Sequence, residues 1–157
     1  MRIALDTNVL VSAFISKHGH PARLIDVILT FPEIKLVLSE PILLEFREVL
    51  LREEVRKRFD YSHKDIESFV RNMRGISSMI TVESKFKVIK EDPKDDIVIN
   101  TAFDAKADWI VSGDSHLRKT RRFRNIRIVN PKQMIRVFAR SFGELMVTHN
   151  EIGNPSP

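Results

Sequence analysis

Short apolar runs alternate with amphipathic segments along most of the chain, and this alternation limits the possible fold more than any other feature. The first run, residues 2–5, stops at an acidic residue, Asp6. Further strand-like runs are predicted at residues 35–39, 79–82, 108–112 and 126–129. Strands that alternate with helices form parallel sheets covered on both faces. We therefore expect an α/β protein with three layers, α/β/α, around a parallel sheet of roughly five strands.

The predicted helices have recognisable starts. Ser39 is placed to cap a helix with Pro41 in its first turn, and Asp92 is placed to cap another that begins at Pro93. Apolar residues at helical spacing predict the remaining helices. The helical segments are residues 9–14, 21–29, a helix following residue 39, 64–73, 93 to about 105, and a last helix after residue 131.

Length and composition fit one compact domain. The chain has 157 residues, of which 43% are hydrophobic, and no cysteine. The missing cysteine excludes a disulfide framework, a thiolate zinc site and a cysteine nucleophile. We predict a single domain over residues 1–140 and a C-terminal extension over residues 141–157, whose polar end from residue 148 should fray.

The sequence also bears on location and partners. No apolar run approaches the roughly 18 residues of a membrane span, and the apolar N-terminal stretch contains Asp6 and Asn8. We therefore expect a cytoplasmic protein that does not bind membranes. The net charge of +5 favours an anionic partner, first of all a nucleic acid, although a merely solvated basic surface explains it about as well.

Two acidic residues follow predicted strands. Asp6 ends the first strand, and Asp114 lies just beyond the fourth. Open parallel sheets bind ligands beyond the carboxyl ends of their strands. The segment around Asp6 is apolar enough to be buried, so its carboxylate needs hydrogen bonds or a cation. For Asp114, a role in the turn is equally compatible with the sequence.

Two further positions stay open. Asp95 and Asp96 are both in the first turn of a predicted helix, where acids also compensate the helix dipole. Glu45 and Glu48 both border the apolar stripe of the helix that follows Ser39, and helical periodicity does not separate them.

Several acids at one place repel each other unless their pKa values rise or a cation neutralises them. The five histidines show no paired ligand spacing, so the available donors are oxygens. Oxygen donors suit Mg²⁺ or Mn²⁺ better than zinc. A hard divalent ion in a basic protein indicates phosphate chemistry.

Four segments together resemble a PIN domain, in the order and at the spacing of that family. They are LDTNVL at residues 5–10, SEPILLEF at residues 39–46, DPKDDIVI at residues 92–99 and ADWIVSGD at residues 107–114. The resemblance extends from residue 1 to about residue 138. It is nearest to the branch described as toxins of toxin–antitoxin systems.

The resemblance implies metal-dependent cleavage of RNA with Mg²⁺ or Mn²⁺. The family's acidic residues fall on Asp6, Glu45, Asp96 and Asp114, which would be both catalytic and metal ligands. Its supporting positions fall on Asn8 and Ser112, with Asp95 as the alternative to Asp96. A cognate antitoxin and a homodimer are partners that the resemblance also implies.

Basic residues crowd the segment after Asp114, which we expect to lead from the mouth of the site into the fifth strand. They are Arg118, Lys119, Arg121, Arg122, Arg124 and Arg127. We interpret the first four as candidates for binding the phosphates of RNA. A solvated loop with salt bridges is the competing interpretation.

Three other functions fit parts of the pattern. A housekeeping nuclease of RNA processing would carry the same residues, and a catalytically silent binding module would keep the fold. A phosphatase of the haloacid dehalogenase type also starts with an acid after its first strand, but it needs a second Asp where this chain has Asn8.

Overall fold

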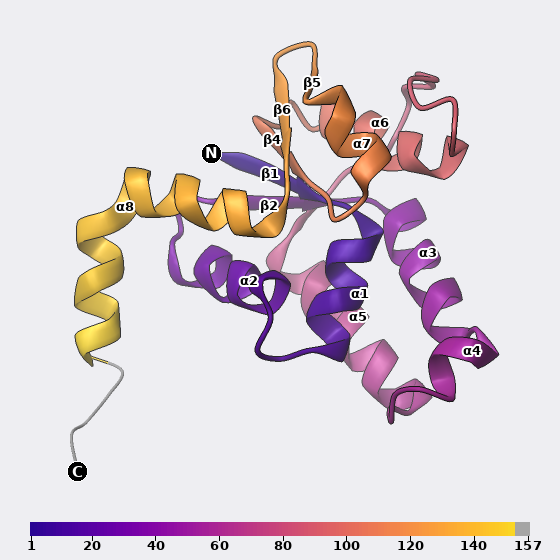
Figure 1. Cartoon of the computed structure of the whole chain (residues 1–157), viewed down its shortest axis with the longest axis horizontal. Coiled ribbons are helices and arrows are strands. Elements are labelled where there is room, and N and C mark those ends of the chain that lie inside the picture. The colour runs from indigo at the N-terminus through magenta and orange to yellow at the C-terminus, as the bar shows by residue number, and fades with distance from the viewer. Residues whose placement is uncertain (153–157) are drawn as a thin grey trace.

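The computed structural model describes residues 1–152, with side chains through residue 143, and its centre is a six-stranded sheet (Figure 1). The strand order is β3-β2-β1-β4-β6-β5, and all neighbours pair in parallel except β5 and β6. The strands are β1 (Arg2–Leu5), β2 (Lys35–Leu38), β3 (Ser78–Met79), β4 (Trp109–Val111), β5 (Arg122–Phe123) and β6 (Ile126–Val129). The α/β architecture expected from the sequence is confirmed.

The central strands are apolar, in keeping with their burial. Ile3, Ala4 and Leu5 of β1 are fully inaccessible, as expected for a central parallel strand. The third strand starts one residue earlier than expected and is only two residues long. Strand β5 was not predicted from the sequence, and it adds an antiparallel edge strand next to β6.

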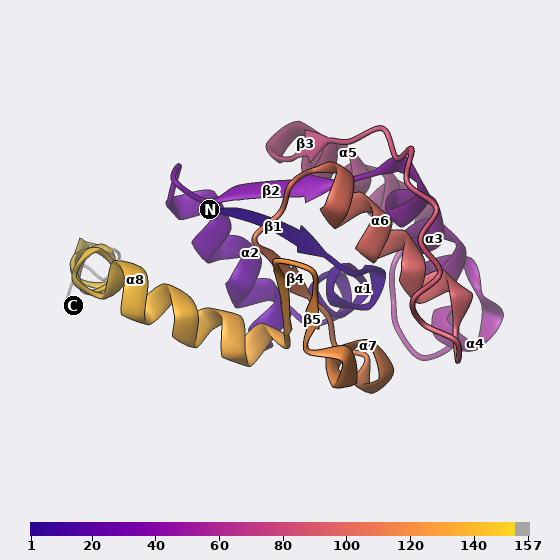
Figure 2. The ribbon, with the colours of Figure 1, turned by 90° about the horizontal axis from the view of Figure 1, so that it is seen from above.

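The helices flank this sheet. They are α1 (Thr7–Ile15), α2 (His20–Thr30), α3 (Glu40–Leu51), α4 (Glu53–Arg56), α5 (His63–Ile76), α6 (Asp96–Asp104), α7 (Ser115–Thr120) and α8 (Pro131–Ile152), with a 3₁₀ turn, η1 (Pro93–Asp95), before α6. Helix α6 packs against β1, β2 and β4, and Figure 2 shows α2 and α6 on opposite sides of β1. The expected layers are therefore present, whereas the short helices α4 and α7 were not predicted.

The two predicted helix caps differ in detail. Asp92 accepts a hydrogen bond from the Lys94 N–H at 3.0 Å and so caps η1 as expected. Ser39 occupies the N-cap position of α3, but its hydroxyl makes no cap hydrogen bond. That hydroxyl is buried and pairs with the Thr101 hydroxyl at 2.7 Å, which ties α3 to α6.

The strand order places a topological switch beside β1. The chain builds β1, β2 and β3 outward in one direction and then returns to β4 on the other side of β1. The segments that leave β1 and β4 therefore diverge at the carboxyl end of the sheet. Such a point is where open α/β sheets bind their ligands.

The C-terminal helix α8 follows Pro131 as predicted and packs against α2. Its backbone departs from helical geometry at Phe142. The division between a domain and an extension at residue 140 stays a prediction. The expected polar tail covers the end of α8 and residues 153–157, which lie outside the described residues. None of the helices in the described part of the chain is both long and apolar enough to cross a bilayer.

Candidate functional site: an acidic cluster at the switch point

Asp6 is held rigidly at the carboxyl end of β1. Its backbone N–H donates to the Val111 carbonyl oxygen at 2.9 Å, which continues the pairing of β1 with β4. Its Oδ1 accepts from the Thr7 N–H at 2.8 Å, so Asp6 is the N-cap of α1. Its Oδ2 accepts from the Ser112 hydroxyl at 2.7 Å and the Asn8 amide at 3.0 Å.

Burial dominates the titration of Asp6, whose exposed fraction is 5%. It raises the pKa of Asp6 to about 6, although the hydrogen bonds from Ser112 and Thr7 lower it. The carboxylates of Glu45 and Asp114 contribute to this rise in the pKa of Asp6. Asp6 is therefore a carboxylate that the fold buries among other acids, as the sequence indicated.

Asn8 and Ser112 connect the two strand ends. The Asn8 side chain donates to Asp6 and accepts from the Gly113 N–H at 2.8 Å. The buried Ser112 hydroxyl accepts from the Asp114 N–H at 3.0 Å while it donates to Asp6. A Cβ on Gly113 would stand 3.2 Å from the Asn8 Oδ1, so a larger residue there would push Asn8 by a few tenths of an ångström. This close approach of Gly113 to Asn8 was not predicted from the sequence.

Asp114 lies at the start of α7. Its Oδ1 accepts from the N–H groups of His116 and Leu117, at 2.7 and 3.1 Å. Asp114 therefore has the turn role that the sequence allowed, as the cap of α7. Its carboxylate is also close enough to Asp6 to raise the pKa of Asp6.

Glu45, not Glu48, faces the cluster. The Thr7 hydroxyl donates to the Glu45 Oε2 at 2.7 Å, so the residue after Asp6 also positions Glu45. Glu48 is exposed on α3. Sequence reasoning did not assign a role to Thr7.

Of the two adjacent acids, Asp95 faces the cluster, whereas Asp96 does not. The Asp96 Oδ1 accepts from the N–H groups of Val88 and Ile89, both at 2.9 Å, and so anchors the segment before η1. The Asp95 Oδ2 is buried and has no hydrogen-bond partner within the described residues. The expectation that placed Asp96 with the other acids is not what the geometry shows, because η1 turns Asp95 inward.

Burial is the main reason why the pKa of Asp95 rises to about 7, and neighbouring carboxylates contribute in the same direction. These are, in order of effect, Asp114, Asp6, Asp92 and Glu45. The acidic residues that raise the pKa of Asp95 thus come from four places in the chain. Removing a hydrogen-bond partner from a buried carboxylate is costly, so the arrangement calls for a proton or a cation.

The donor chemistry fits a hard divalent cation. The cluster offers carboxylate oxygens and neither thiolate nor imidazole, which suits Mg²⁺ or Mn²⁺. Within the described residues no three acidic, histidine or cysteine side chains are already arranged as a metal site. The physical reason is visible in the contacts, since Asp6, Glu45 and Asp114 are each turned toward protein donors. In the part of the chain whose side chains are described, Asp95 Oδ2 is the one buried carboxylate oxygen without a hydrogen-bond partner.

The predicted basic patch separates into distinct places. Arg118 is on α7 beside the site, where its Nε donates to the Asp114 carbonyl oxygen at 3.2 Å, and the exposed Lys119 follows it. Arg121 ends α7 with a φ of 57°. Arg122 belongs to β5, which pairs with the start of β6. It therefore lies at the end of the sheet where the parallel strands begin, away from the acidic cluster.

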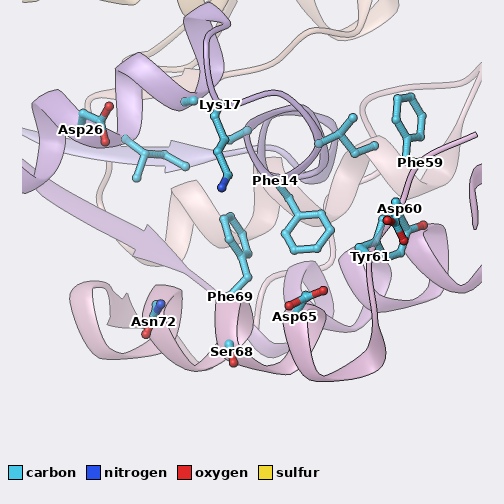
Figure 3. A pocket seen from close by; sticks show the side chains of 14 residues that line it. Phe14, Lys17, Asp26, Phe59, Asp60, Tyr61, Asp65, Ser68, Phe69 and Asn72 are labelled. Carbon is cyan, nitrogen blue, oxygen red and sulfur yellow. The ribbon is translucent and has the colours of Figure 1, made fainter.

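Two cavities lie near α1. A small one of about 270 Å³ borders the acidic cluster and is lined in part by Asn8, Gly113 and Asp114. A larger groove of about 750 Å³ lies at the other end of α1 and includes Phe14, where Figure 3 shows Phe69 and Tyr61 around it. Because Phe14 is two helical turns beyond Asp6, this groove is separate from the cluster.

Comparisons with known proteins agree with this architecture. The sequence model of the PIN domain matches residues 2–116. The chain is 30% identical over 148 residues to a protein of Methanocaldococcus jannaschii described as the uncharacterized protein MJ1680, which covers 88% of this chain and 92% of the relative.

A solved structure has a similar fold. The crystal structure of VapBC2 from Rickettsia felis, bound to a DNA fragment from its promoter, superposes with a TM-score of 0.55. The likeness covers 83% of this chain and 98% of that chain at 16% identity, so it concerns the fold. The chain belongs to the PIN domain family, which confirms the resemblance found in the sequence.

Proposed function

We propose that this protein is a metal-dependent ribonuclease whose active site is the acidic cluster at the switch point. The observation that carries the proposal is the buried, unpartnered Oδ2 of Asp95 among the carboxylates of Asp6, Glu45 and Asp114. Membership of the PIN domain family supports the same conclusion. The basic side chains next to the site suit an anionic substrate.

Each residue has a distinct role in this proposal. Asp6, Asp95 and Asp114 would hold one or two ions, and Glu45 would contribute from α3. Thr7 positions Glu45, and Ser112 and Asn8 fix the carboxylate of Asp6 through hydrogen bonds. This assignment replaces Asp96 with Asp95 as the ligand, because Asp95 faces the other acids with an unpartnered Oδ2, whereas Asp96 is turned toward the backbone of Val88 and Ile89.

Bound Mg²⁺ or Mn²⁺ would supply a water of lowered pKa and neutralise charge on the phosphoryl oxygens. Arg118 and Lys119 would hold the substrate phosphates beside Asp114. Attack by water on phosphorus leaves a 5′-phosphate and a 3′-hydroxyl. A product with a 2′,3′-cyclic phosphate would contradict this chemistry.

The test is cleavage of an end-labelled single-stranded RNA by the purified protein in Mn²⁺, Mg²⁺ or EDTA. We expect cutting that needs the metal and disappears in Asp6→Asn. The matched control is Asp26→Asn, because Asp26 is exposed on α2 and outside the cluster. Cutting that survives EDTA or Asp6→Asn would refute the proposal. Binding without cutting would favour the catalytically silent module, and a phosphorylated Asp6 would favour the phosphatase.

We further propose that the protein acts as the toxin of a toxin–antitoxin pair, with an antitoxin as its partner, in the cytoplasm. The resemblance of the four sequence segments to that branch supports this role. Expression of the intact protein should then arrest growth, and co-expression of an adjacent gene should relieve the arrest. Growth that is unaffected by the active enzyme would favour a housekeeping role. Sedimentation would show whether the protein is a homodimer.

A further inference from the structure

A second group of basic residues lies at the end of the sheet where the parallel strands begin, opposite the acidic cluster. A cavity of about 330 Å³ opens where β1, β4 and β6 begin. Its lining residues are Met1, Asp108, Trp109, Arg122, Asn125 and Arg127. In Figure 1 the start of β1 lies near the strands of the β5–β6 hairpin.

Strand register places the two arginines and the tryptophan on one face. Trp109 of β4 is directly opposite Arg127 of β6, and Arg127 is directly opposite Arg122 of β5. Residues in register on neighbouring strands point to the same side of a sheet. The spacing between strands is about 4.8 Å, so the three side chains form a continuous row.

Neither arginine of this row has a salt-bridge partner among the described residues. Like charges directly opposite each other destabilise a strand pair, yet Arg122 and Arg127 are both exposed and neither forms a salt bridge with any described residue. Asp108 also lines the cavity, and its negative charge offsets one of the two positive charges. Its Oδ2 accepts the Arg2 N–H at 2.8 Å. The two arginines still leave the lining with a net positive charge. The cavity is therefore well suited to an anion.

The aromatic ring orients one of the cations. The guanidinium of Arg127 lies over the Trp109 ring, 5.2 Å from its centroid. Stacking on a ring limits the motion of a long side chain and leaves the N–H donors at its rim available. An arginine fixed in this way presents a planar set of donors, which matches the oxygens of a phosphate.

We propose that Arg122 and Arg127 form a phosphate-binding pocket that holds the backbone of the RNA away from the cleavage site. This inference rests on the proposed ribonuclease function, since it assigns to that substrate a second contact at the opposite edge of the sheet. The contact is independent of sequence, because it is made with phosphates. It lengthens the stretch of RNA that the protein binds beyond the nucleotides at the acidic cluster.

The test is the salt dependence of RNA binding by the full chain in EDTA, where the RNA stays intact. Log affinity falls with log salt concentration by about 0.7 for each phosphate contact to a single strand. We expect Arg122→Ala to reduce this slope by about 0.7, and Arg122→Ala with Arg127→Ala to reduce it by about 1.4. The matched control is Lys64→Ala with Arg71→Ala, which removes two exposed charges from α5 and should leave the slope unchanged.

The outcomes separate the two proposals. Three outcomes would refute the phosphate-binding pocket. They are a slope that falls equally in the control variant, an unchanged slope in the arginine variants, and no RNA binding by the intact protein. The urea midpoint of each variant shows whether it is folded. If the double variant does not fold, Arg122→Ala alone, on the exposed edge strand β5, provides the test. Cleavage in Mn²⁺ tests the enzyme separately. Binding of RNA with the expected slopes but without cleavage would refute the ribonuclease function and support the phosphate-binding pocket.

Discussion

At the scale of single residues, we expect substitutions of the adjacent residues Asp95 and Asp96 to have clearly different effects on cleavage. Asp95→Asn removes the charge that the cluster leaves unpartnered, and we expect it to lower metal-dependent cleavage by at least about 100-fold. Asp96→Asn keeps an oxygen that can accept the Val88 and Ile89 N–H groups, so cleavage should stay within a few-fold of the wild type. Single-turnover cleavage in Mn²⁺ measures both. The opposite ranking would restore Asp96 as the ligand.

The raised pKa values predict how stability depends on pH. The pKa values of Asp6 and Asp95 rise from 3.8 to about 6 and about 7 in the folded protein. A group whose pKa is raised by folding stabilises the fold fully below its unfolded value, and this contribution is lost as the pH rises through the folded value. The metal-free protein should therefore lose stability as the pH rises from about 4 through about 7, and its stability should level off above that.

Asp95→Asn should remove part of this dependence and, at pH 8 without metal, stabilise the fold by on the order of 2 kcal/mol. Urea unfolding in EDTA at several pH values provides the measurement, with Asp26→Asn as the control. Curves for Asp95→Asn that run parallel to those of the wild type would show that Asp95 does not carry the effect.

At the scale of elements, the β5–β6 hairpin depends on Arg124. This residue has a φ of 51°, a left-handed conformation that favours glycine. Its guanidinium lies 5.0 Å from the centroids of Phe86 and Phe103, and 5.8 Å from that of Phe123. We infer that these cation–π contacts offset the backbone strain, which gives Arg124 a structural role.

Arg124→Ala keeps the unfavourable φ and loses the ring contacts, so we expect it to cost about 1–2 kcal/mol of unfolding free energy. Arg124→Gly loses the same contacts but relieves the strain, and should cost less. Urea midpoints compare the two directly. An alanine variant as stable as the wild type would show that the three rings do not need the arginine.

At the scale of the whole molecule, binding of a divalent ion should stabilise the fold. A ligand that binds only the folded state adds about 2.7 kcal/mol at 100 times its Kd, which for a chain of this size raises Tm by roughly 5–10 °C. We expect Mn²⁺ to raise Tm of the wild type and of Asp26→Asn, and EDTA to reverse the rise. Asp6→Asn combined with Asp95→Asn should show little or none. An equal rise in that variant would place the metal elsewhere.

Much of the fold could be predicted because strands and helices leave local patterns. The runs that became β1, β2, β4 and β6 are apolar and end at polar residues, and helix starts such as Asp92–Pro93 are marked by their cap chemistry. The elements that were missed, α4, α7 and β5, have four, six and two residues. Segments this short contain too few residues for a period to appear.

The sequence was enough to place Asp6 and Asp114 after strands, since local apolarity defines where the strands end. It could not choose between Asp95 and Asp96, because adjacent side chains on a helix point about 100° apart and the 3₁₀ turn η1 sets the phase. Nor could it choose Glu45, whose partner Thr7 is 38 residues away. Packing between distant segments turns Asp95 and Glu45 toward the other acids. It also places Arg122 at the opposite end of the sheet, because β5 reverses the direction of the chain.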